Sequence, residues 1–256
     1  MKKIIALLLA VVCASVCFAG CDKASDESSA TSGEKETLTI ATSPDFPPFE
    51  SLEGEEVVGI EVELVKLICA DIGMDYEFVQ IDFDSVLLGV QSGKYTCGMS
   101  GITVDDDRKE NMLFTDPYYI AAQVIVVKED STIASKADLE GKTVSVQTGT
   151  TAEKGCGDAG IAVEAFAQNA DAKAALTTGK VDAWVVDNLT AIQMVVEGDG
   201  LKILEENLTE EPYALAFAKG NEELVEKINA SLKTLIDNGS VEKIFTDFGE
   251  TYVKPE

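Results

Sequence analysis

Arg108 is the residue whose chemistry most favours binding of a charged group. It is the only arginine in the 256-residue chain, which contains no histidine. A planar guanidinium binds a carboxylate through two parallel hydrogen bonds, which no lysine can do. Arg108 also follows three aspartates, 105–107, so an alternative is a surface arginine paired with that acidic run. The lack of histidine removes the Ser-His-Asp and Cys-His nucleophile pairs and most catalytic zinc sites, so binding is favoured over catalysis.

Two further positions lie where a predicted strand meets a predicted helix. Gly149, Thr150 and Thr151 follow a β-rich run and open a helix, so free N–H groups and the positive helix end could receive a carboxylate. Simple N-capping by threonine is the alternative, and both could hold at once. Asp187 ends an apolar strand and precedes a helix, where it could face a ligand or cap that helix.

Strands and helices that alternate must position these residues. The first half of the chain predicts strands at 38–42, 76–80 and 97–100 and helices at 61–72 and 85–91, with Gly73 and Gly93 as helix stops. The second half repeats the order, with strands at 143–147, 162–166 and 183–186 and helices from 150 and over 169–177. Such alternation indicates βαβ units and parallel sheets.

The repeat predicts two lobes of similar construction. Val90-Gln-Ser-Gly-Lys94 and Leu176-Thr-Thr-Gly-Lys180 each precede a predicted strand. Extended runs at 117–127 and 213–218 predict two strands that cross between the lobes, and helices at 222–237 and 241–248 should pack back on lobe one. We expect an α/β fold with mainly parallel sheets flanked by helices, lobe one being 38–121 with 215–256 and lobe two 122–214. A crevice between α/β lobes is where such folds bind ligands.

The first 37 residues resemble an export and anchoring segment. A basic start, an apolar run and Phe18-Ala-Gly-Cys21 are similar to a bacterial lipoprotein signal, which implies cleavage after residue 20 and a lipid on Cys21. An ordinary secretory signal is the alternative. Residues 21–37 are rich in Ser, Ala, Thr and acidic residues and predict a flexible tether. The expected location is therefore the extracytoplasmic face of the cell membrane.

The charge and the cysteines exclude several classes of partner. Asp and Glu number 46 against 20 Lys and Arg, a formal charge of −26, which argues against nucleic-acid binding. Outside the leader, Cys69, Cys97 and Cys156 have no CxxC spacing, so no metal or redox motif is predicted. Cys69 and Cys97 could pair, or all three could be buried thiols. No cofactor or metal is expected.

Several motifs in order resemble the polar amino-acid binding proteins of ABC importers, the extracellular solute-binding proteins of family 3. They are Thr42-Ser-Pro-Asp-Phe-Pro-Pro-Phe-Glu50, Gly59-Ile-Glu-Val-Glu-Leu64, Gly101-Ile-Thr-Val-Asp-Asp-Asp-Arg108, Phe114-Thr-Asp-Pro-Tyr118, Gln147-Thr-Gly-Thr-Thr151 and Val181-Asp-Ala-Trp-Val-Val-Asp187. The resemblance covers about Leu38 to the C-terminus and implies the two-lobed fold of type II periplasmic binding proteins.

The resemblance also implies a role for each site residue. Arg108, Thr150 and Thr151 would hold the α-carboxylate of a free amino acid, and Asp187 would hold its α-ammonium. Gly101, through a backbone donor, and Thr103, through its hydroxyl, would also grip the ligand. Phe46 would cover the ligand side chain and Phe83 would form another part of the pocket wall, although either could be a core residue. Ser43 occupies a position at which relatives carry an acidic or amide group that recognises the ligand side chain. Thr96 and Ala152 depart from the family pattern, which obscures the specificity.

The implied activity is capture of an amino acid by hinge closure and delivery to an ABC permease, by a chain that works as a monomer. Two alternatives stay open. A prephenate- or arogenate-type dehydratase is known on this fold, but we find no additional carboxylate to act as its general acid. A ligand-binding sensor module is the other alternative.

Overall fold

The computed structural model describes residues 35–255, and its first sheet has five strands. Their order is β5 (Asp75–Gln80), β1 (Thr37–Thr42), β6 (Cys97–Gly98), β15 (Ala216–Ala218) and β7 (Met112–Phe114). β5, β1 and β6 are parallel, whereas β15 is antiparallel to both of its neighbours. This sheet unites the first part of the chain with a strand that returns from near the C-terminus.

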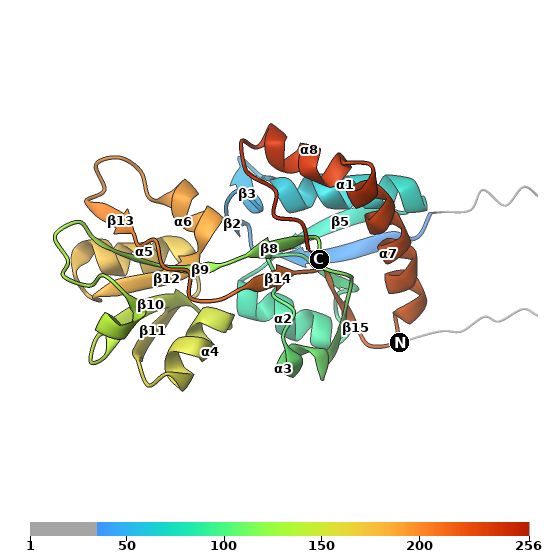
Figure 1. Ribbon diagram of the computed structural model, residues 1–256. Helices are drawn as coiled ribbons and strands as arrows, with labels where there is room; N and C mark the ends of the chain where they lie inside the picture. Colours follow the sequence, from blue (N-terminus) through green and yellow to red (C-terminus); the bar gives the residue numbers. More distant parts are fainter. Residues whose placement is uncertain (1–34, 256) are drawn as a thin grey trace, which may run out of the picture. The chain divides into compact units, whose positions relative to one another are not determined.

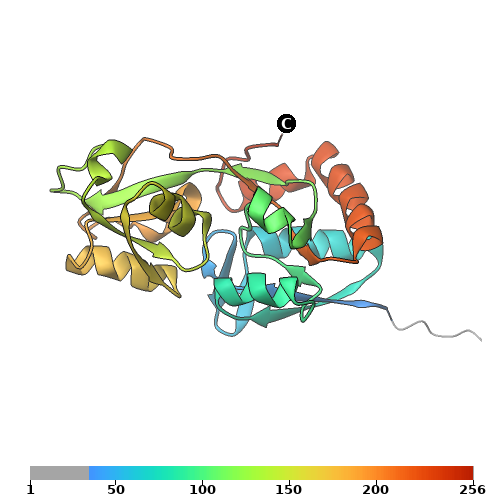
Figure 2. The same ribbon diagram turned by 90° about the horizontal axis from the view of Figure 1, so that it is seen from below.

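Helices cover both faces of the first sheet. α1 (Ile60–Ile72) packs with α7 (Glu222–Asp237) and α8 (Ser240–Asp247), and these three lie together in both ribbon views (Figure 1 and Figure 2). α2 (Phe83–Gln91) and the short α3 (Asp106–Lys109) lie on the opposite side of the sheet (Figure 1). α1 ends at Gly73, whose φ of 73° is the left-handed conformation that glycine adopts at low cost.

The second sheet repeats this plan. Its order is β11 (Ala162–Phe166), β10 (Thr143–Gln147), β12 (Ala183–Asp187), β9 (Gln123–Lys128) and β13 (Leu201–Ile203). The first three strands are parallel, and β9 is antiparallel to β12 and β13. α4 (Thr151–Asp158), α5 (Asn169–Thr178), α6 (Asn188–Met194) and the 3-10 helix η1 (Lys136–Leu139) complete this lobe.

Two antiparallel strands connect the lobes. β8 (Tyr119–Ala121) leads into β9, and β14 (Glu211–Tyr213) leads back into β15. β8 and β14 pair with each other. In Figure 1 they lie between the two larger sheets. The backbone N–H of Ile120 also donates to the carbonyl of Val253, at 3.2 Å, so the C-terminal segment is attached to the same crossing.

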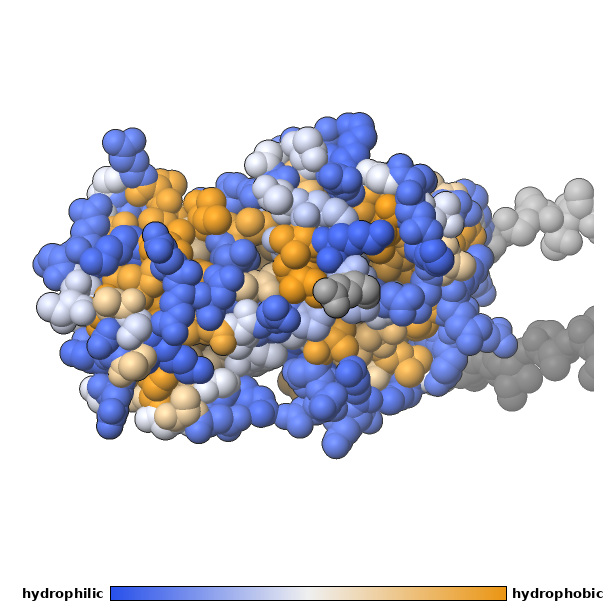
Figure 3. Space-filling view, in the orientation of Figure 1, coloured by the Kyte–Doolittle hydropathy of each residue, from blue (hydrophilic) through white to orange (hydrophobic). Residues whose placement is uncertain are grey.

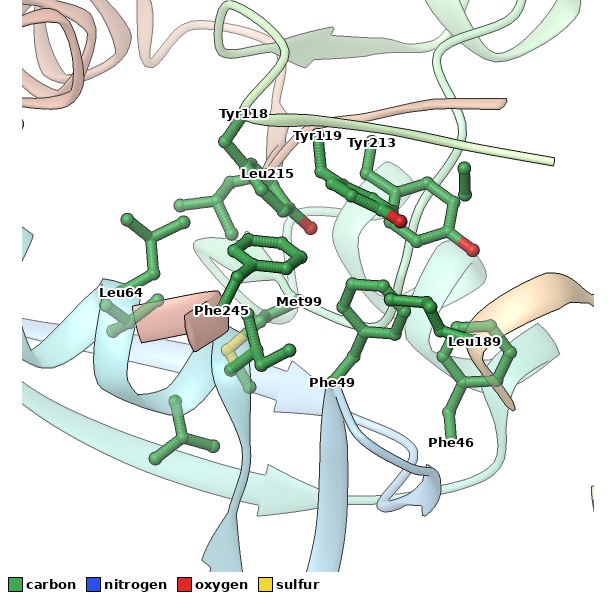
Figure 4. Packing of buried hydrophobic residues seen from close by; sticks show 14 of the residues in the cluster. Phe46, Phe49, Leu64, Met99, Tyr118, Tyr119, Leu189, Tyr213, Leu215 and Phe245 are labelled. Carbon is green, nitrogen blue, oxygen red and sulfur yellow. The ribbon is translucent and has the colours of Figure 1, made fainter. Parts of the chain in front are cut away.

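An aromatic cluster packs around this crossing (Figure 4). The rings of Tyr119 and Phe245 stack at 4.7 Å between centroids, and Phe49 lies edge-on to Tyr213 at 5.1 Å. Phe46 stacks on Phe49 at 5.6 Å and so reaches from the cluster toward the cleft. The cluster joins β8 and β14 to lobe one, which fixes the base from which lobe two extends.

The two-lobed α/β prediction is confirmed, with two additions. Each sheet contains antiparallel strands beside its parallel core, and the chain forms a three-stranded antiparallel sheet that the sequence did not indicate. That sheet comprises β2 (Asp45–Phe46), β3 (Glu50–Glu53) and β4 (Glu56–Val58). The lobe boundaries at 121/122 and 214/215 stay predictions, and the leader and most of the tether lie outside the described residues.

Cys69, Cys97 and Cys156 are free, buried thiols, so the pairing of Cys69 with Cys97 is absent. Burial raises the pKa of Cys69 to about 11. Within residues 35–255 no helix combines the length and the apolar character needed to cross a bilayer. The face shown in Figure 3 is mainly hydrophilic, with smaller apolar areas.

Candidate functional site

A small cavity of about 30 Å³ lies between the two lobes. It is formed by residues at strand ends and helix starts, as expected for an α/β crevice. Eight of the nine predicted binding residues line it: Phe46, Phe83, Gly101, Thr103, Arg108, Thr150, Thr151 and Asp187. The other lining residues are Ser100, Gln123, Gln147, Ala152, Asn169, Val185 and Val186.

Arg108 reaches from lobe one to the backbone of lobe two. Its Nη1 donates to the carbonyl of Thr103 at 2.9 Å, and its Nη2 donates to the carbonyl of Gly149 at 3.1 Å. Its Nε lies 3.4 Å from Asp105, and the side chain is 11% exposed, so it is not a surface arginine although it does pair with the acidic run. A guanidinium has five N–H groups, so one on each terminal nitrogen is left to bind a carboxylate.

Asp187 lies at the end of β12 and turns toward the crossing strands. The hydroxyl of Tyr213 donates to its carboxylate, and the Asp187 side chain makes no capping bond to α6, against the capping alternative. Burial, and then the charge of Glu211, raise the pKa of Asp187, while the Tyr213 hydrogen bond and the charge of Arg108 oppose the rise; the resulting pKa is about 7. A cation bound here would restore the charged carboxylate.

Thr150 and Thr151 have different partners at the start of α4. The Thr150 hydroxyl accepts from the Glu153 N–H at 3.2 Å, so the capping role is present. The Thr151 hydroxyl accepts from the Gln123 amide at 2.8 Å and donates to Glu211 at 3.0 Å. The Gly149 N–H donates to the Glu153 carboxylate at 2.6 Å, so the prediction that it is free for a ligand is wrong. Thr151 and Ala152 open α4, and their N–H groups have no acceptor within the helix, which leaves these two available to an anion in the cavity.

Phe46, Phe83 and Gly101 shape the lobe-one wall. Phe83 begins α2 and lies under the Arg108 guanidinium, whose central carbon is 5.7 Å from the ring centroid. Gly101 has φ +53°, and a Cβ there would lie 2.5 Å from a Phe46 ring carbon, so the close contact requires glycine. The Gly101 N–H donates to Glu61 at 3.0 Å, so the prediction that this backbone donor holds the ligand is wrong.

Ser43 is the predicted site residue that does not line the cavity. It is 1% exposed, and its hydroxyl donates to Asp45 at 2.8 Å. Sequence reasoning missed the polar residues Ser100, Gln123, Gln147, Asn169 and Glu211. Gln147 and Asn169 had a usable signal, since one ends a predicted strand and the other opens a predicted helix, whereas Glu211 is hidden in an acidic run.

Two buried carboxyl groups form hydrogen bonds with Ser100 and Gly101, which line the cavity. Glu50 and Glu61 are both fully buried; Glu50 accepts from the Ser100 hydroxyl at 2.8 Å, and Glu61 accepts from Gly101 and from the Tyr118 hydroxyl. Burial, and then the charge of Glu61, raise the pKa of Glu50 well above its usual value. In residues 35–255 no group of three or more His, Cys, Asp or Glu side chains is placed to hold a metal ion.

The model of the bacterial extracellular solute-binding proteins, family 3, matches residues 38–251. The arginine-binding extracellular protein ArtP of Bacillus subtilis is 35% identical over 224 residues, which cover 85% of this chain and 87% of ArtP. The L-cystine-binding protein TcyJ of Escherichia coli is 27% identical, with 82% of each chain covered.

Solved structures show the same similarity. An ancestral arginine-binding protein bound to glutamine superposes with a TM-score of 0.80 at 39% identity, covering 85% of this chain and all of the other. The arginine-, lysine-, histidine-binding protein ArtJ of Geobacillus stearothermophilus gives 0.80 at 33% identity, with 86% and 97% covered. These relatives are binding proteins, which rejects the dehydratase alternative. The chain belongs to the family 3 bacterial extracellular solute-binding proteins and is a solute-binding protein rather than an enzyme.

Proposed function

We propose that this protein captures a free amino acid with a basic side chain in the interlobe cavity and delivers it to an ABC importer. The observation that carries the proposal is the presence of Arg108 and Asp187, from different lobes, on the wall of one cavity. A zwitterion needs a cation for its α-carboxylate and an anion for its α-ammonium. Arg108 and the start of α4 supply the first, and Asp187 supplies the second.

The balance of charge around the cavity supports a basic ligand. Asp187 lines the cavity, Glu211 contacts the lining residue Thr151, and Asp45 contacts the lining residues Gln147 and Asn169, whereas Arg108 is the only cation among the lining residues. An α-carboxylate paired with Arg108 would leave an excess of negative charge, which a cationic side chain reduces. The relatives named for arginine agree with this reading, so L-arginine is the first candidate.

Hinge closure is the proposed mechanism. The ligand contacts residues of both lobes, and only the interactions that it gains in the closed form shift the protein toward closure. β8 and β14 are the crossing strands about which the lobes would move. Phe46 and Phe83 would lie against the ligand side chain and exclude water from the charged contacts.

The proposal includes export and anchoring at the extracytoplasmic face of the membrane through a lipid on Cys21, with the tether giving reach to a permease. The support is the lipoprotein-like leader and the relative named as extracellular. A monomer is sufficient, because one chain supplies every group of the site. A sensor that presents the ligand to a receptor uses the same site, and uptake of radiolabelled arginine by cells lacking this chain separates the two.

Calorimetry against the twenty amino acids, ornithine and cystine tests the ligand. L-arginine, lysine or ornithine should bind most tightly, and a ligand at 100 times its Kd should raise the free energy of unfolding by about 2.7 kcal/mol. Glutamine is the informative competitor, because its side chain is polar but carries no charge. Tight binding of an acidic or apolar amino acid, with no binding of basic ones, would contradict the proposed ligand class.

A further inference from the structure

Asp45 joins the two lobes without lining the ligand cavity. It belongs to β2 in lobe one, and both of its carboxylate oxygens accept from the side-chain amide of Gln147 in lobe two, at 3.2 and 3.1 Å. The backbone N–H of Asn169 donates to the same carboxylate at 2.7 Å. Asn169 is the first residue of α5, so Asp45 lies at the positive end of a helix that belongs to the other lobe.

The contact also orients two side chains of the cavity wall. The Asn169 amide donates to Asp45 at 3.4 Å and to the Gln147 carbonyl oxygen at 3.0 Å, so the three side chains form a closed network. Gln147 donates to the carbonyl of Ala167 as well, at 3.1 Å. Gln147 and Asn169 both line the cavity, whereas Asp45 lies behind them.

Lobe one holds Asp45 in place for this contact. The Ser43 hydroxyl donates to it at 2.8 Å, and the Asp45 N–H donates to the Ser43 carbonyl at 2.8 Å. A carboxylate that is fixed from one lobe and receives donors from the other makes charge-assisted bonds, which are stronger than neutral ones. Those bonds form only when the lobes approach, so they favour the closed form even without ligand.

We propose that Asp45 is an interlobe latch and a positioning residue: it holds the start of α5 and the Gln147 and Asn169 amides against lobe one when the cleft closes. The latch stabilises the closed form independently of ligand identity. It depends on the proposed function only in that the ligand occupies this cavity. Loss of the latch should therefore speed ligand release more than it slows ligand entry.

Single-molecule energy transfer on the ligand-free protein tests the latch. Ala137 in η1 and Ala230 in α7 are exposed and lie in different lobes, so each is replaced by an unnatural amino acid with a ketone group. The two dyes are coupled to these ketones, so the native cysteine thiols stay unlabelled. Asp45→Asn removes the charge with little change of shape, and Gln147→Met removes the donor from the other lobe. The matched control is Asp71→Asn, an exposed aspartate in α1 of the same lobe.

Asp45→Asn and Gln147→Met should each lower the ratio of closed to open molecules about tenfold, the effect of losing charge-assisted bonds. The double variant should change the ratio little beyond the single ones, and Asp71→Asn should leave it within twofold. With arginine as the probe, Asp45→Asn should speed dissociation about tenfold while association stays within about threefold. Thermal melting of each variant checks that it is folded.

Any of three results would contradict the latch. They are the absence of closed molecules in the ligand-free wild type, an unchanged ratio of closed to open molecules in Asp45→Asn, and effects of Asp45→Asn and Gln147→Met on that ratio that are fully additive in the double variant. If Asp45→Asn does not fold, Gln147→Met alone decides, because it removes the contact from lobe two. The energy-transfer measurements need no ligand, so their outcome can be told apart from a failure of the arginine proposal.

Discussion

Binding of a basic amino acid should weaken sharply as the pH falls below 7, and Asp187 is the reason. Burial and the charge of the nearby Glu211 raise the pKa of Asp187 to about 7. The ligand ammonium needs the ionised carboxylate, so binding must expel the proton that Asp187 carries at low pH. The direction of this pH dependence follows from linkage. A ligand that lowers the pKa of a carboxyl group binds more tightly as the pH rises through the pKa which that group has without ligand.

The size of the effect follows from this one pKa. If bound ligand returns the Asp187 pKa to its ordinary range, the affinity at pH 6 should be about 10-fold and at pH 5 about 100-fold below its value at pH 8. Proton release on binding should be about 0.9 per ligand at pH 6, about 0.5 at pH 7 and about 0.1 at pH 8. Calorimetry in buffers with different ionisation enthalpies counts these protons directly.

Three variants assign the pH dependence to Asp187. Tyr213→Phe removes a hydrogen bond that stabilises the ionised carboxylate, so the midpoint of the pH dependence should move upward. Glu211→Gln removes a like charge and should move the midpoint downward. Asp187→Asn should bind weakly and release no proton. An affinity that is constant from pH 5 to 8, with no proton released by the wild-type protein, would refute this account of Asp187.

Three further predictions concern the other parts of the site and the anchor. Arg108→Ala strands the ligand carboxylate and should weaken binding on the order of 30- to 4,000-fold; a loss below threefold in calorimetry would remove Arg108 from the site. Gly101→Ala places a Cβ 2.5 Å from the Phe46 ring at φ +53°, so chemical denaturation should show a loss of about 1–3 kcal/mol; unchanged stability would contradict the close packing. Cys21→Ser should abolish incorporation of labelled fatty acid and release the chain from the membrane fraction; continued labelling would contradict the proposed anchor.

The regular elements were predictable because their patterns are local. The predicted helix at 222–237 matches α7 at both ends, and its apolar face packs on α1 as the periodicity required. Gly93 and Gly179, the two helix stops of the repeat, both have positive φ. By contrast, β2 to β4 are two to four residues long and mix acidic with apolar residues, so no period distinguishes them from a loop.

The site was predictable only where a single residue carried its own chemical signal. Arg108 stood out as the one guanidinium, and Asp187 as a carboxylate at the end of an apolar strand. Asp45 gave no such signal, because its role depends on which residues of the other lobe face it, 102 and 124 positions away in sequence. Contacts of this kind are created by the placement of the lobes, which no local pattern encodes.

Two of the contacts between the lobes, those made by Asp45 and by Arg108, divide the energetics of closure between protein and ligand. Asp45 bonds to Gln147 and Asn169, and Arg108 bonds to the carbonyl of Gly149. The first contact can persist when a ligand enters, because Asp45 lies behind the cavity wall. The Arg108 guanidinium must instead direct its remaining N–H groups to the ligand carboxylate, so its contribution to closure depends mostly on the ligand.

A stronger latch would raise the affinity by lowering the free energy needed to reach the closed form, but it would also slow the opening that ligand release requires. An intermediate strength at Asp45 is therefore what a protein that must both capture and release its ligand needs.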